Sequence, residues 1–253
     1  MLATDRTTDG PTERWTTRSG VRIRFLDNSP GTSVGLPILL SPGVTDFAGE
    51  YAEVLTHLLP RRAVVVEVRG RGESDAPATG YAAADHADDL AAALEEAGID
   101  RFHLMTFSRG TTWGLDLVLR DPARVATVSI GEYWTGEHAL EAHIADTLMA
   151  TRFRGRPMID RVQPHVLSEM FRVSQTRDLC DDLAATGLPV LMATGTSAEG
   201  RMLNDDTLAE YGRRIPGLET VIIDGAGHDL FRPNRHAYPS AVRDFIARRA
   251  PGT

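Results

Sequence analysis

Residues 101–120, RFHLMTFSRGTTWGLDLVLR, decide the fold. The first part, residues 102–107, is a short and mostly apolar run of the kind that forms a buried strand. The second part, residues 111–120, has apolar side chains at helical spacing and is closed by an Asp-Pro pair. Ser108 falls between them, so the sequence predicts a serine on a tight turn from strand to helix, presented above the edge of a sheet.

The turn reads Thr-Phe-Ser-Arg-Gly over residues 106–110, close to the Gly-x-Ser-x-Gly pattern of a nucleophile elbow. In that geometry the backbone N–H of the next residue, Arg109, is free to hydrogen-bond a developing oxyanion, and the helix N-terminus favours negative charge. Thr106 stands where the pattern has its first glycine, so we expect a slightly wider turn. An ordinary serine between a strand and a helix is the alternative, and the motif alone does not decide between them.

Length and composition narrow the class of protein. The 253 residues suit one large α/β domain or two small ones. A formal net charge of -8, without a basic patch, argues against nucleic acid as the main partner. Cys180 is the single cysteine, so no internal disulfide framework or thiolate metal site is expected.

No apolar stretch approaches membrane-spanning length, and residues 1–20 lack the hydrophobic region of a signal peptide. We therefore expect a cytoplasmic enzyme with a small-molecule substrate and no membrane partner. Neither a metal nor an organic cofactor is expected. The oligomeric state, a homodimer included, is left open.

Strand patterns alternate with helix patterns along the chain. Apolar runs predict strands at residues 21–25, 36–40, 63–68, 102–107, 125–130, 188–194 and 218–223, and helices are expected at 46–59, 81–98, 111–120 and 238–249. The alternation of apolar residues with arginine in 21–25 indicates a half-exposed edge strand. Such an order implies an α/β fold with a mostly parallel, doubly wound sheet.

Residues 135–187 show helix-like segments and no strands, which indicates an insertion over the strand ends. The predicted organisation is a flexible tail at 1–14, a core formed by 15–134 and 188–253, and a helical cap at 135–187. Ligands bind such sheets in the crevice at the carboxyl ends of the strands.

One further feature at that edge is the turn that follows the strand at 36–40. It reads Ser-Pro-Gly-Val over residues 41–44, and the glycine lets the next backbone N–H point into the crevice. We therefore expect the N–H of Val44 to be a second oxyanion donor beside that of Arg109. A plain turn at the end of a strand is the alternative.

A serine nucleophile needs a base, and His228 is the strongest candidate. It lies in IDGAGHD, residues 223–229, a loop of small residues directly after the last predicted strand. Glycines there let the loop bring the imidazole back over the sheet. The other histidines lie in helix patterns, in the elbow strand, in the insertion or in the closing segment: His57, His86, His103, His138, His143, His165 and His236.

Over nearly its whole length the chain resembles the α/β-hydrolase superfamily. The resemblance rests on the Pro-Gly turn at 42–43, the RGRGESD loop at 69–75, the serine elbow and GAGH at 225–228, in that order. It implies the α/β-hydrolase fold with a short helical cap. Three positions depart from the usual pattern: Thr106, Glu67 and Ser41.

The resemblance leaves the acid of the triad open. The superfamily often places it after the strand at 188–194, where the nearest acidic residue is Glu199, at a displaced position. Another branch, which includes zearalenone-type lactone hydrolases, places it one strand earlier, directly after the strand at 125–130. Glu132 occupies that position, and we favour it over Glu199. A glutamate in a surface turn is the alternative interpretation of Glu132.

Ser108 as nucleophile favours hydrolysis of a carboxylic ester or lactone through an acyl-enzyme. Thioester or carbon–carbon bond hydrolysis with the same triad, and a non-hydrolytic lyase or ligand-binding role, are the alternatives. Apolar residues of the insertion and the rim suggest a mainly apolar substrate, and those expected to contact it are Phe47, Trp134, Phe153 and Phe231. The side chain of Arg109 is expected either to form an ion pair or, less favoured, to meet a substrate carboxylate.

Overall fold

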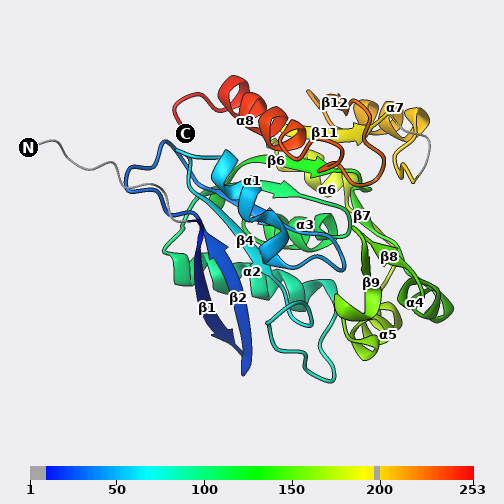
Figure 1. Cartoon of the computed structure of the whole chain (residues 1–253). Helices are drawn as coiled ribbons and strands as arrows, with labels where there is room; N and C mark the ends of the chain where they lie inside the picture. Colours follow the sequence, from blue (N-terminus) through cyan, green and yellow to red (C-terminus); the bar gives the residue numbers. More distant parts are fainter. Residues whose placement is uncertain (1–9, 197–199) are drawn as a thin grey trace, which may run out of the picture.

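The computed structural model describes residues 10–196 and 200–253. An eight-stranded sheet runs through the molecule in the order β1-β2-β4-β3-β5-β6-β11-β12, with helices on both faces (Figure 1). Pairing is antiparallel from β1 to β2 and from β2 to β4, and parallel across the rest of the sheet. The mostly parallel, doubly wound sheet predicted from the sequence is confirmed.

The strands of the sheet are β1 Thr12–Arg18, β2 Val21–Asp27, β3 Ile38–Ser41, β4 Ala63–Glu67, β5 Phe102–Thr106, β6 Val125–Gly131, β11 Val190–Gly195 and β12 Glu219–Ile223. Helices around it are α1 Ala52–His57, α2 Ala83–Ala97, α3 Gly110–Arg120, α6 Cys180–Ala185, α7 Asp205–Arg214 and α8 Ala237–Arg249, with 3-10 turns η1 Ala48–Tyr51 and η2 Pro122–Arg124. Strands β3, β4, β5 and β11 are buried at every position, which explains why their sequences are mostly apolar.

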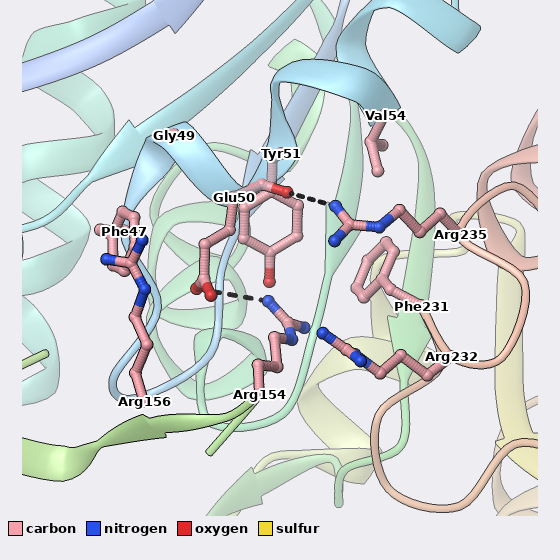
Figure 2. A pocket seen from close by; sticks show the side chains of 10 residues that line it. All are labelled: Phe47, Gly49, Glu50, Tyr51, Val54, Arg154, Arg156, Phe231, Arg232 and Arg235. Atoms are coloured by element: carbon pink, nitrogen blue, oxygen red, sulfur yellow. Dashed lines mark hydrogen bonds and ion pairs between the residues drawn. The ribbon is translucent and has the colours of Figure 1, made fainter. Parts of the chain in front are cut away.

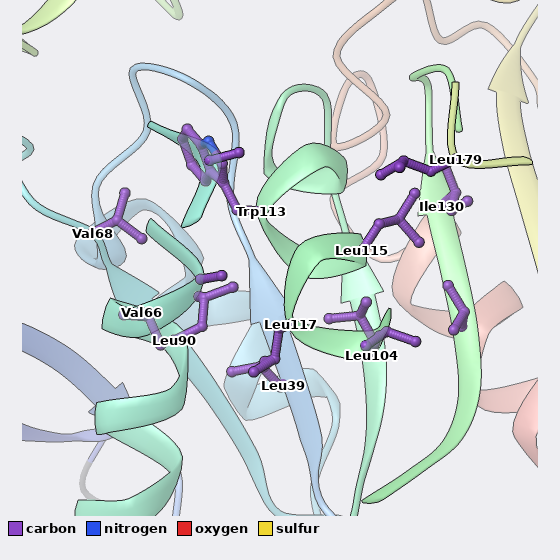
Figure 3. Packing of buried hydrophobic residues seen from close by; sticks show 14 of the residues in the cluster. Leu39, Val66, Val68, Leu90, Leu104, Trp113, Leu115, Leu117, Ile130 and Leu179 are labelled. Carbon is purple, nitrogen blue, oxygen red and sulfur yellow. The ribbon is translucent and has the colours of Figure 1, made fainter. Parts of the chain in front are cut away.

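Two hydrophobic clusters hold the helices against the sheet. On one face, α2 and α3 pack around Trp113, Leu90 and Leu104 (Figure 3). On the other face, α1 and α8 pack around Val65 and Phe245. The elbow strand β5 contributes to both clusters, so the serine that follows it stands on a backbone fixed from two sides.

The N-terminal part of the prediction is wrong in two respects. Strand β1 begins at Thr12, inside the expected tail, and pairs with β2 along its whole length. β1 is therefore the edge strand, and β2, which was expected at the edge, lies between β1 and β4. The threonine-rich sequence of β1 suits an exposed strand, and Arg22 stacks over the Trp15 ring at 3.7 Å. Residues 1–9 of the expected tail lie outside the described residues.

The insertion contains short strands as well as helices, so the expectation of no strands at 135–187 is wrong. Its elements are β7 Gly136–Glu137, α4 Ala142–Met149, β8 Arg152–Phe153, β9 Arg156–Pro157, η3 Met158–Asp160, α5 Pro164–Val173 and β10 Arg177–Asp178. Two-residue strands are too short to produce a period in the sequence. Helices α4 and α5 lie together beside the hairpin β8–β9 (Figure 1). The bounds proposed for the cap remain a prediction.

Two further differences concern helices. The expected helix at 46–59 is divided into η1 and the shorter α1, and α7 was not predicted. Within the described ranges, no helix has both the length and the apolar composition that crossing a bilayer requires.

Candidate active site

Ser108 stands on a strained turn at the end of β5. Its φ is +51°, a left-handed conformation that is costly for a residue with a side chain. The turn is held by hydrogen bonds from the Ser108 N–H to the Gly131 carbonyl (2.8 Å) and from the Thr111 N–H to the Ser108 carbonyl (2.9 Å). Position 110 must be glycine, because a Cβ on Gly110 would lie 2.2 Å from the Pro42 carbonyl oxygen.

Thr106 is accommodated by the helix behind the turn. Its hydroxyl lies 2.8 Å from that of Thr111, and its methyl group faces Gly114, where a Cβ would come within 2.9 Å. Gly114 of α3 thus provides the space that a glycine at position 106 would otherwise provide. Close packing of strand and helix is kept, with a different residue providing the space.

His228 lies over the sheet edge, where its ring connects Ser108 to Glu132. Nε2 is 2.9 Å from the Ser108 hydroxyl oxygen, and Nδ1 is 3.4 Å from Glu132 Oε2. A carboxylate can only accept, so the hydrogen of the neutral ring belongs on Nδ1 and Nε2 is left to accept from Ser108. The Phe107 ring packs against the imidazole at a centroid distance of 5.3 Å.

Glu132 follows β6 and is fully buried, so it is not a surface turn residue. Its φ is +49°, and its N–H donates to the Ala193 carbonyl (2.9 Å). The carboxylate accepts hydrogen bonds from the Thr194 hydroxyl (2.5 Å) and the Met202 N–H (2.8 Å). Burial raises the pKa of Glu132, but hydrogen bonds from His228, Met202 and Thr194 outweigh it, so the pKa lies below its ordinary value.

The rival acid, Glu199, lies outside the described residues. The structure therefore brings together Ser108, His228 and Glu132 at the carboxyl edge of the sheet, in the order that a serine, its base and an orienting acid require.

Neighbouring groups fix the turn that carries Val44, one of the two expected oxyanion donors. Arg71 Nε donates to the Val44 carbonyl at 2.8 Å, and the Asp46 carboxylate accepts the Gly43 N–H at 3.0 Å, which fixes the turn after β3. Among the described residues, the N–H groups of Val44 and Arg109 have no hydrogen-bond acceptor. Both donors are thus available for a ligand oxygen, as an oxyanion hole needs.

The Arg109 side chain is turned into the protein. It is 3 % exposed and forms an ion pair with Glu137 at 3.2 Å. The same guanidinium donates to the His138 carbonyl at 3.2 Å, and Arg177 also pairs with Glu137 at 3.0 Å. Of the two expectations for this side chain, the structure contains the ion pair.

The four residues expected to contact substrate fall in different places. Phe47 and Phe231 line a cavity of about 270 Å³ (Figure 2). Trp134 lines a separate cavity of about 140 Å³ beside β7. Phe153 packs under the guanidinium groups of Arg154 and Arg161, at 4.9 and 5.0 Å from its ring centre.

Four arginines that the sequence patterns did not point to line the cavity that contains Phe47 and Phe231: Arg154, Arg156, Arg232 and Arg235. The alternating arginines of RFRGRP at 152–157 were the available signal. In the described parts of the chain, no three His, Cys, Asp or Glu side chains are grouped to hold a metal ion.

Residues 37–154 match the family model described as the alpha/beta hydrolase fold. The enol-lactonase from Burkholderia xenovorans LB400 superposes with a TM-score of 0.76 over 92% of this chain and all of the other, at 18% identity. The chain has the α/β-hydrolase fold. The fold expected from the motifs is therefore confirmed.

Curated proteins that resemble this chain are named as hydrolases. The RutD protein of Variovorax paradoxus (strain S110), named as a carbamate hydrolase, is 34% identical over 123 residues, which are 47% of this chain and 46% of that protein. The chain thus matches about half the length of that relative. The 2-(acetamidomethylene)succinate hydrolase of Mesorhizobium japonicum is 24% identical over 83% of this chain and 87% of its own.

Proposed function

We propose that this α/β-hydrolase cleaves a carboxylic ester or lactone of a mainly apolar small molecule through an acyl-enzyme. The observation that carries the proposal is the unbroken series of contacts from Ser108 through His228 to the buried Glu132. A small-molecule substrate and a cytoplasmic location are parts of the same proposal.

In the first half of the reaction, His228 Nε2 removes the proton of Ser108 as Oγ attacks the carbonyl carbon. The N–H groups of Val44 and Arg109 hold the oxyanion of the tetrahedral intermediate. Glu132 stabilises the imidazolium that forms and keeps the ring oriented. Collapse of the intermediate breaks the bond to the leaving oxygen, which takes the proton from Nε2, and the acyl group remains on Ser108.

In the second half, His228 removes a proton from water, which attacks the acyl-enzyme. The oxyanion forms again at the same two N–H groups, and its collapse returns the proton to Ser108 Oγ and releases a carboxylic acid. A lactone opens by the same steps, with the leaving alcohol tethered to the acyl group. The position of Glu132 after β6 resembles that in zearalenone-type lactone hydrolases, and this resemblance is the reason for including lactones.

Turnover on a panel of substrates tests the proposal. We expect the protein to hydrolyse p-nitrophenyl butyrate or an alkyl lactone faster than a butyryl thioester or a vinylogous diketone. A carbamate belongs in the panel because of the name of the RutD relative. Preference for the thioester or the diketone would favour the alternative reactions of the same triad, and no turnover by folded protein would favour a lyase or ligand-binding role.

A further inference from the structure

The cavity lined by arginines lies between η1, the hairpin β8–β9 and the loop that follows His228 (Figure 2). Its volume is about 270 Å³, and its walls combine aromatic rings with arginines. Four arginines and a single carboxylate, Glu50, line it. The charge of this wall is therefore strongly positive before neighbouring groups are considered.

Two arginines, Arg154 (half-buried) and Arg161 (buried), bind the carboxylates around the cavity. Arg154 donates two hydrogen bonds to the Asp229 carboxylate, of 2.8 and 2.9 Å, and its guanidinium lies 3.3 Å from the Glu50 carboxylate. Arg161, which is fully buried, pairs with Asp46 at 3.2 Å and with Glu50. These two guanidinium groups therefore neutralise much of the negative charge of the carboxylates behind the cavity.

Carboxylates balance only a small part of the positive charge of the other three lining arginines. No described carboxylate lies within 4.0 Å of Arg156, which is exposed and stacks over the Phe47 ring at 5.4 Å. Arg232 reaches Asp229, already bound to Arg154, only at 3.7 Å. Arg235 lies 3.7 Å from an exposed glutamate of α1 and donates to the Glu50 carbonyl at 3.4 Å. N–H donors therefore remain free at the cavity (Figure 2).

The rest of the wall is apolar. Phe47, Tyr51, Val54 and Phe231 contribute rings and a branched side chain to the cavity. Guanidinium groups bind carboxylates in a planar, two-pronged geometry, and aromatic walls favour a ligand with an apolar body. An inorganic anion would use only the first of these features.

We propose that this cavity binds a small organic carboxylate, with its charged group among Arg156, Arg232 and Arg235 and its apolar body against Phe47 and Phe231. The site is distinct from the position of the proposed nucleophile. Neither Ser108 nor His228 lines the cavity, and the Phe107 ring packs 5.3 Å from that of Phe231 and 5.3 Å from that of His228. Binding here does not depend on the proposed reaction.

Calorimetric titration of the full-length protein with benzoate tests the site. Benzyl alcohol has the same ring without the charge, and inorganic phosphate has the charge without the ring. We expect benzoate to bind, benzyl alcohol not to bind, and phosphate to bind at least about tenfold more weakly. Phosphate binding as tight as that of benzoate, or no binding of benzoate, would overturn the proposal.

Paired variants locate the binding. The double variant Arg156→Gln/Arg232→Gln should raise the benzoate dissociation constant by about tenfold or more. Arg248→Gln is the matched control, because Arg248 is 57 % exposed, as Arg232 is 55 % exposed, and each pairs with one carboxylate. Equal affinity in the double variant and the control would contradict the site. Both substituted side chains are exposed, and thermal unfolding of each variant checks that it folds.

Steady-state kinetics of ester hydrolysis in the presence of benzoate distinguish two possible sources of the carboxylate. If the carboxylate is the reaction product or part of the substrate, benzoate should compete with an ester such as p-nitrophenyl butyrate. If it is a separate small molecule, benzoate should leave the Michaelis constant of that ester unchanged. Either result is consistent with the site, provided that the double variant loses the binding of benzoate. Benzoate binding that persists unchanged in the double variant would contradict the site.

Discussion

Glu132 combines full burial with a charged form that its neighbours stabilise. Replacing it with glutamine keeps the shape but offers His228 Nδ1 an N–H donor or a weaker acceptor, which disturbs the ring's tautomer. We expect Glu132→Gln to lower kcat/KM by about a thousandfold or more, while the unfolding transition shows a folded protein. Steady-state kinetics on an ester that the wild type turns over measures this.

Glu199→Gln is the comparison for that prediction, because Glu199 is the other acid that the sequence offers. It should retain most of the activity. A large loss in Glu199→Gln with little change in Glu132→Gln would overturn the assignment of the acid.

Arg109 illustrates a residue beside the nucleophile whose side chain serves packing and charge balance. Arg109→Met leaves the buried Glu137 with only Arg177, so we expect it to lower the free energy of unfolding by about 3 kcal/mol. The double variant Arg109→Met/Glu137→Gln should lose less than the sum of the single changes, since the two side chains share one interaction. Urea unfolding of the four proteins provides the cycle.

The result for Arg109 would be different if the side chain met a substrate carboxylate. Arg109→Met would then unfold like the wild type and lose activity only on esters that carry a carboxylate. That outcome would contradict the ion-pair account.

Among elements, the start of α3 depends on one glycine. In Gly110→Ala the new methyl group would lie 2.2 Å from the Pro42 carbonyl oxygen and 2.4 Å from that of Ser41, both backbone atoms that cannot move aside cheaply. We expect a loss of about 2 kcal/mol or more of unfolding free energy and most of the activity, because both the elbow and the turn that carries Val44 would shift.

Gly212→Ala is the matched helix control. Nothing lies within 4 Å of a Cβ built on Gly212, and this glycine sits inside α7. Alanine there should stabilise the protein by up to about 1 kcal/mol and leave activity unchanged. Thermal unfolding and ester kinetics of both variants test the pair, and equal behaviour of the two would contradict the packing account of the elbow.

The elements that the sequence revealed are those with a clear physical pattern. Parallel strands such as β4 are buried on both faces and so read as unbroken apolar runs, and α2 ends at Gly98 with a φ of +66°, as a helix stop requires. Edge strand β1 is half-buried at most and rich in threonine, so it resembled a tail. The two-residue strands of the insertion carry no pattern that could predict them.

At the site, Ser108, Glu132 and His228 lie in the loops that follow β5, β6 and β12, and motif order together with these strand ends pointed to them. The cavity lined by arginines was not predicted. Its ion pairs join residues far apart in the chain, such as Glu50 with Arg161 and Arg154 with Asp229, and only the folded chain brings them together.

For the whole molecule, two buried histidines predict how stability depends on pH. Burial lowers the pKa of His103 to about 4, and burial with the nearby Arg71 lowers that of His86 well below 6.5. The unfolded chain therefore binds protons below about pH 6.5 that the folded protein does not bind. We expect the free energy of unfolding to fall as the pH is lowered from 6.5 to 4, by up to about 1.4 kcal/mol per pH unit for each histidine.

His103→Gln isolates one part of this dependence. It removes the titrating group and keeps a polar side chain opposite Thr127, which lies 3.0 Å from the His103 ring. Urea unfolding at a series of pH values should show a shallower slope between pH 6.5 and 4 in this variant. An unchanged slope would show that His103 is not buried in its neutral form.

The central claim is that Ser108 is an activated nucleophile, and one measurement addresses it directly. The wild type and Ser108→Ala are incubated with a fluorophosphonate, and their intact masses are recorded. The account predicts a single adduct on the wild type and none on the variant. A folded wild type without an adduct, or an adduct that persists in Ser108→Ala, would contradict it.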